Sequence, residues 1–117
     1  MIDKLGGLMG LLANKGKIQE EMAKFQQRVA QITAEGTAGG GMVTVKANGK
    51  LEVTACRLSD EAVKLNDREM LEDLVIAATN QALGKVREQI AAETNKVAAS
   101  LGLPPGMLGG GGFPGLG

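Results

Sequence analysis

Residues 66–82 read NDREMLEDLVIAATNQA and predict the start of a long amphipathic helix. Asn66 is a good helix cap, and Glu69, three residues later, completes the pattern of a capping box. Acidic side chains in the first turns place negative charge at the positive end of the helix dipole: Asp67, Glu69, Glu72 and Asp73. The helix is expected to continue to about Ser100, which is too long for one small protomer to cover.

Both predicted helices carry an apolar seam with heptad-like spacing, a pattern typical of a helix that packs on another helix. The first helix is expected from about Lys17 to Thr33, and its seam consists of Ile18, Met22, Phe25, Val29 and Ile32. The second helix, capped by Asn66, has a seam formed by Ile76, Leu83 and Ile90, followed by Val97. These residues are candidates for a helix seam or a dimer interface.

Two short runs between the helices alternate apolar and polar side chains, as strands do. They are residues 42–47 and 51–56, and Asn48-Gly49 between them is a strong signal for a hairpin with a type I′ turn. A helical turn is expected from Ser59 to Leu65. The chain is therefore predicted to be α+β: a helix, a small antiparallel sheet of two to three strands, and a long helix.

The composition favours a dimer. Among 117 residues there are two Phe, no Trp and no Tyr, so a monomer would have a thin core. The single cysteine, Cys56, cannot form an internal disulfide, which is typical of a reducing compartment. No apolar run is long enough to span a bilayer, so no membrane partner is expected.

Three segments are predicted. Residues 1–16 form a flexible lead into the first helix, because the apolar start carries Asp3 and lacks the basic cluster of a signal peptide. Residues 17–101 form the folded, dimerising domain. Residues 102–117 form a disordered tail, because Pro104 and Pro105 stop a helix and many glycines follow.

Residue types argue against an enzyme. The chain has no histidine, which removes the usual base of nucleophilic catalysis and the commonest metal ligand. Cys56 lies in a strand pattern without a base nearby, and helix capping explains the acidic residues 67–73. The glycines at 36–41 are followed by a strand, unlike a phosphate-binding loop. We therefore expect no catalytic residue, cofactor or metal.

Basic residues suggest a nucleic-acid surface, although the formal net charge is zero. Lys17, Lys24 and Arg28 fall within roughly 40° on the first helix, at about 100° per residue. Two copies of such a stripe can follow phosphates without reading bases. On sequence alone, however, ordinary ion pairs with Glu20 and Glu21 account for much of this pattern. The long helix adds weaker candidates: Lys85, Arg87 and Lys96.

Several segments resemble the YbaB/EbfC family of small bacterial nucleoid-associated DNA-binding proteins, in order and spacing, over about residues 15–106. They are IQEEM (18–22), EGTAGGGMV (35–43), VKANG (45–49), EMLEDLV (69–75) and LPPG (103–106). The resemblance implies an α-β-β-β-α protomer, with a third strand near residues 33–38 where local propensity is poor. It also implies a dimer with joined sheets and projecting helical arms that binds duplex DNA with little sequence preference.

The prediction is a cytoplasmic, nucleoid-associated homodimer that binds duplex DNA through phosphate contacts and contributes to nucleoid organisation and gene regulation. The alternative is a dimeric protein-interaction module that grips another protein and has weak or incidental DNA affinity. The two differ in salt response, because only DNA binding releases condensed counterions.

Overall fold

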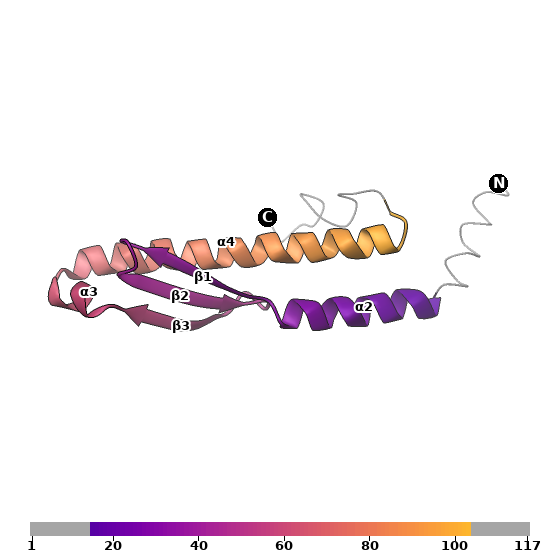
Figure 1. The fold of residues 1–117 in the computed structure, drawn as a ribbon, viewed down its shortest axis with the longest axis horizontal. Helices are drawn as coiled ribbons and strands as arrows, with labels where there is room; N and C mark the ends of the chain where they lie inside the picture. Colours follow the sequence, from indigo (N-terminus) through magenta and orange to yellow (C-terminus); the bar gives the residue numbers. More distant parts are fainter. Residues whose placement is uncertain (1–14, 104–117) are drawn as a thin grey trace. The chain divides into compact units, whose positions relative to one another are not determined.

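The computed structural model describes residues 15–103, and Figure 1 shows their arrangement. The elements follow in the order α2 (Lys15–Ala30), β1 (Thr33–Ala38), β2 (Val43–Asn48), β3 (Val53–Leu58), α3 (Asp60–Lys64) and α4 (Arg68–Ser100). This order confirms the α+β class and the third strand. The predicted lead 1–16 and tail 102–117 lie outside the described residues, except at their inner ends.

The chain divides into two compact units. Residues 28–93 form one unit, which contains the sheet, α3 and most of α4. The other unit contains residues 15–27 of α2 and 94–103 at the end of α4, among the residues described here. The division lies inside both long helices, between residues 27 and 28 of α2 and between residues 93 and 94 of α4. The predicted domain limits of 17–101 stay a prediction.

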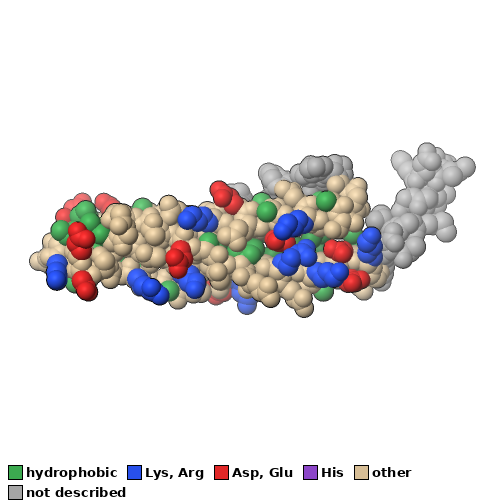
Figure 2. All heavy atoms as spheres, viewed as in Figure 1, with side chains coloured by type: hydrophobic (Ala, Val, Ile, Leu, Met, Phe, Trp, Pro, Cys, Tyr) green, Lys and Arg blue, Asp and Glu red, His purple; other side chains and the backbone are tan. Residues whose placement is uncertain are grey.

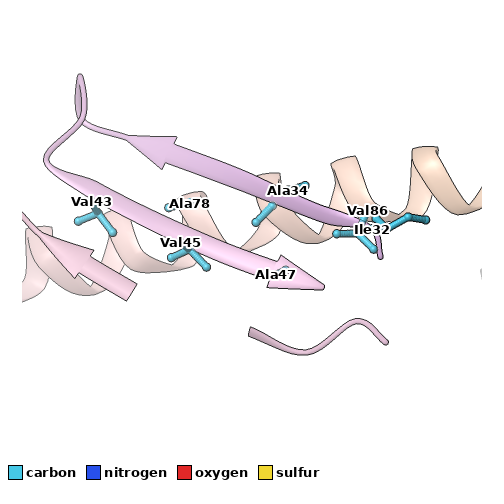
Figure 3. Packing of buried hydrophobic residues seen from close by; sticks show 8 residues of the cluster. Ile32, Ala34, Val43, Val45, Ala47, Ala78 and Val86 are labelled. Atoms are coloured by element: carbon cyan, nitrogen blue, oxygen red, sulfur yellow. The ribbon is translucent and has the colours of Figure 1, made fainter. Parts of the chain in front are cut away.

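The three strands form an antiparallel sheet in the order β1-β2-β3, and α4 packs against one face. β2 alternates as predicted: Val43, Val45 and Ala47 are fully buried, whereas Lys46 is exposed. Figure 3 shows these side chains meeting those of the helix. Within the sheet unit, the buried face of α4 consists of Ala78, Ala82 and Val86.

The helix approaches β1 closely because Gly36 has no side chain. A Cβ at Gly36 would collide with the carbonyl oxygen of Ala78 and lie 2.5 Å from the backbone nitrogen of Ala82. Alanine at both helix positions keeps the contact surface of α4 shallow. The closeness of helix and strand therefore depends on three small residues that hydrophobic periodicity does not single out.

β3 differs from the other strands because every one of its residues is exposed. Its residues Cys56 and Leu58 pair directly with Val45 and Val43, so they point to the same face of the sheet as the core. Leu58 nevertheless remains 44% exposed. The helix thus covers β1 and β2 and leaves the same face of β3 uncovered.

Three predicted boundaries are wrong by a few residues. The strand expected over residues 51–56 is β3, which begins at Val53 and ends at Leu58. α2 ends at Ala30 and not at Thr33, because Thr33 is already paired with Asn48 in the sheet. The cap of α4 is Asp67, whose Oδ1 accepts a hydrogen bond from the backbone N–H of Met70 at 3.1 Å. Asn66 adopts a positive φ of 49° before the helix, a conformation that asparagine tolerates well.

The predicted hairpin is confirmed, but its type I′ turn is wrong. Leu51, and not Gly49, has a left-handed φ of 61°. The Asn48 side chain accepts hydrogen bonds from the N–H groups of Lys50 and Glu52, at 2.9 and 3.2 Å. A glycine is still needed at position 49, since a Cβ there would collide with the carbonyl oxygen of Val29.

Candidate nucleic-acid interface

Charge is divided between the two units. The unit of residues 28–93 contains eight Lys and Arg against ten Asp and Glu, a net charge of −2. The rest of the chain contains five against three, a net charge of +2. Figure 2 shows basic side chains, with some acids among them, over the part of the molecule that contains α2. Positive charge is thus concentrated outside the sheet unit, although the whole chain is neutral.

Lys17 and Lys24 are exposed on α2. Lys24 Nζ lies 3.3 Å from Glu20 Oε1 and 3.9 Å from Glu21 Oε1, and its side chain is 51% exposed. The helical ion pairs considered in the sequence are therefore present. Exposed pairs of this kind contribute little stability, so a phosphate can compete for the ammonium group. Lys17 is exposed and forms no ion pair within residues 15–103.

Arg28 has a different environment from the two lysines. Its Nε donates to Glu93 Oε2 at 2.6 Å, and the Glu93 side chain is only 16% exposed. This charge-assisted hydrogen bond joins the end of α2 to α4 within the sheet unit. The partners are 65 positions apart in the sequence, so the spacing of charges within one helix could not predict this bond.

The α4 candidates are also separated. Lys85 Nζ donates to the carbonyl oxygen of Glu35 in β1 at 3.0 Å. Arg87 is exposed in the sheet unit, and Lys96 is exposed in the other unit. Of the six predicted DNA-binding residues, Arg28, Lys85 and Arg87 belong to one unit, and Lys17, Lys24 and Lys96 to the other.

The seam candidates of α2 are partly covered. Ile18 and Phe25 are half-buried, and Met22 is exposed. Val29 packs against the core, and Ile32, beyond the end of α2, is buried in it. Their proposed role in a dimer stays a prediction.

The seam candidates of α4 lie beside its buried face. Leu83 and Ile90 pack partly against the core, and Ile76 is 58% exposed. At about 100° per residue, these three lie on one flank of the buried face, and Gln81 and Lys85 lie on the other. Since Gln81 and Lys85 contact β1, the seam flank faces the β3 side of the sheet.

An apolar surface therefore continues from the core across the β3 side of the sheet unit. Its exposed members come from three neighbouring elements: Val53 and Leu58 of β3, Val63 of α3, Leu65 just after it, and Ile76 of α4. We call this set the β3 surface. Scattered apolar residues are normal on a monomer, but a group that adjoins an incomplete core is a candidate interaction site.

The described residues offer neither a metal site nor a membrane-spanning helix. Within residues 15–103, no group of three His, Cys, Asp or Glu side chains is placed to hold a metal ion. None of the helices in this part of the chain is long and apolar enough to cross a membrane.

Comparison with known proteins decides the family. The model of the YbaB/EbfC DNA-binding family matches residues 5–101. The chain belongs to this family. The match covers nearly the whole chain, so the YbaB/EbfC resemblance drawn from the sequence segments is confirmed.

Similar proteins in this family support the assignment. Proteins from Bacillus thuringiensis (strain Al Hakam) and Bacillus anthracis (strain A0248) are each 44% identical over 104 residues. Each match covers 89% of this chain and 95% of the relative, and both relatives are named nucleoid-associated protein. The crystal structure of the uncharacterized protein HP0035 from Helicobacter pylori has a TM-score of 0.55 at 25% identity. That match covers 76% of this chain and 87% of the other.

Proposed function

We propose that this protein is a non-enzymatic homodimer that binds duplex DNA in the bacterial cytoplasm and contributes to nucleoid organisation and gene regulation. The observation that carries the proposal is the distribution of charge. In this member of a DNA-binding family, the excess of Lys and Arg lies outside the sheet unit, which is itself acidic. The relatives named nucleoid-associated protein support the cellular role.

The mechanism is phosphate binding by exposed ammonium groups. Lys17 and Lys24 exchange water or a weak carboxylate contact for a phosphate oxygen, and the DNA releases condensed counterions. Phosphate contacts carry no base identity, so little sequence preference is expected. The chain has only two Phe and no Trp or Tyr, which leaves few rings for stacking on unpaired bases.

A second copy of the chain is the proposed occupant of the β3 surface. The apolar face of β3 is continuous with the core but lacks cover from its own chain. A copy related by two-fold symmetry offers the same surface, and an isologous contact satisfies both copies at once. The dimer also presents Lys17 and Lys24 twice, which doubles the number of phosphates held.

The test is a charge reversal that leaves Arg28 untouched. Lys17→Glu with Lys24→Glu is expected to lower affinity for random duplex DNA at least tenfold. It should also reduce the salt slope of binding by about one unit per lost phosphate contact. The matched control is Lys50→Glu with Lys64→Glu, which makes the same charge change in the acidic unit. Equal losses in both double variants would refute the assignment to α2.

The alternative function is a dimeric protein-interaction module with weak or incidental DNA affinity. The observation that favours it is the neutral chain, in which Glu20 and Glu21 lie beside Lys24. Titration of the unmodified protein with random duplex DNA at two salt concentrations separates the two functions. No binding at low salt supports the interaction module, whereas tight binding that weakens steeply with salt supports the DNA-binding dimer.

A further inference from the structure

We infer that Gln81 and Lys85 of α4 close the β1 edge of the sheet against strand addition and thereby confine sheet-to-sheet pairing to the β3 edge. Both residues belong to the sheet unit, as does β1. The β3 half of this statement rests on the proposed dimer, whereas the closure of β1 stands on contacts within one chain.

The two side chains occupy backbone groups at the outer edge of β1. Gln81 Oε1 accepts a hydrogen bond from the N–H of Thr37 at 2.6 Å, and Lys85 Nζ donates to the carbonyl oxygen of Glu35 at 3.0 Å. Glu35 and Thr37 are two positions apart, so the same edge of the strand carries both groups. An added strand needs this donor and this acceptor, and both are engaged.

The local sequence explains why α4 can reach the edge. Gln81 and Lys85 are four residues apart and therefore lie on one helix flank. Gly36 lies between Glu35 and Thr37 and has no Cβ to hold the helix away, as the contacts with Ala78 and Ala82 show. The short distance between helix and strand lets two ordinary polar side chains pass beside the strand and bond to its edge.

The β3 edge lacks such a cover. Among residues 15–103, the only side-chain hydrogen bond of β3 runs inward, from Thr54 Oγ1 to the carbonyl oxygen of Lys46 in β2 at 3.3 Å. An unpaired edge is a template for another chain. A sheet with two open edges could join β1 of one copy to β3 of the next, and this heterologous contact would extend without closing. When the β1 edge is blocked, only β3-to-β3 pairing remains, and this pairing gives a two-fold dimer that cannot extend further.

The test is assembly size. Gln81→Ala with Lys85→Ala is expected to form species heavier than the dimer, seen by light scattering after size exclusion, at concentrations at least tenfold below those at which the unmodified protein does so. The matched control is Asn80→Ala with Arg87→Ala, which removes one amide and one positive charge from the exposed face of the same helix. Gln81→Glu with Lys85→Arg keeps an acceptor and a donor and should restore the parent size.

Each outcome decides the inference. A double alanine variant of unchanged size would overturn it, as would heavy species from the control. Heavy species that have lost the helical circular dichroism signal would also overturn it, because unfolding and not an open edge would then drive association. DNA affinity is not the readout, so failure here is distinct from failure of the proposed function.

Discussion

The two edge strands of the sheet, β1 and β3, have opposite environments. β1 is buried on alternate residues, approached closely by α4 and bonded along its edge by helix side chains. β3 is exposed at every residue, including those that point to the core side of the sheet. At β1 the edge groups already have partners within the chain. At β3 the apolar side chains are still exposed, so a second molecule that bound there would bury the most apolar surface.

The difference originates in side-chain size. β1 presents Ala34, Gly36 and Ala38 to the helix, and such small residues allow contact but bury little area. β3 presents Val53 and Leu58, whose full burial contributes about 1.5–3 kcal/mol each. Of the two edge strands, the one with the larger apolar side chains is thus the one that α4 leaves uncovered.

The largest effect is expected where helix and β1 touch. Gly36→Ala forces a methyl group into the backbone of α4, so the free energy of unfolding should fall by about 3 kcal/mol or more. Gly84→Ala is the control, because a Cβ there meets nothing within 4 Å and a helix gains up to about 1 kcal/mol from this change. Urea unfolding of both variants measures the difference. Equal stability would show that α4 can move away from β1 freely.

The next effect concerns the β3 surface. If the proposed dimer forms through this surface, Leu58→Asp should give a monomer by light scattering, because association would bury an unpaired carboxylate. The fold of each chain should survive, since Leu58 is already 44% exposed. Lys50→Asp, on the exposed hairpin, is the control and should stay dimeric. A Leu58→Asp protein that keeps the parent mass would remove β3 from the interface.

A smaller effect is expected at the ion pair that precedes β1. Arg28→Ala removes the partner of a carboxylate that is mostly buried, and the expected loss of stability is about 1–2 kcal/mol, since the arginine side chain is itself 37% exposed. A double-mutant cycle with Glu93→Gln isolates the pair. A coupling energy near zero would show that the Arg28–Glu93 pair does not stabilise the fold, and Arg28 would again be a candidate for phosphate binding.

Local patterns were sufficient to predict much of this fold. Alternation located β2, the hairpin signal located its turn region, and heptad spacing located the long helix with its end at Ser100. The third strand needed the family resemblance, because residues 33–38 contain glycine and alanine and lack strand propensity.

Contacts between distant residues could not be predicted in this way. The bonds of Thr37 with Gln81, Glu35 with Lys85 and Arg28 with Glu93 join positions 44, 50 and 65 apart. No periodicity within one helix encodes them. For this reason the sequence placed Arg28 and Lys85 in a cationic surface without showing that each already has a structural partner.

The smallest effect gives the most local comparison of the two edges. Gln81→Ala removes one hydrogen bond at an exposed position, worth about 1 kcal/mol, so the Thr37 amide should exchange with deuterium roughly five- to tenfold faster. The amides of β3 should not change, because no α4 side chain bonds to them in the part of the chain that the structure describes. Asn80→Ala serves as the control for a lost amide on α4. Faster exchange in both strands would mean that the variant loosens the whole sheet, whereas no change at Thr37 would mean that the Gln81 contact does not protect this edge in solution.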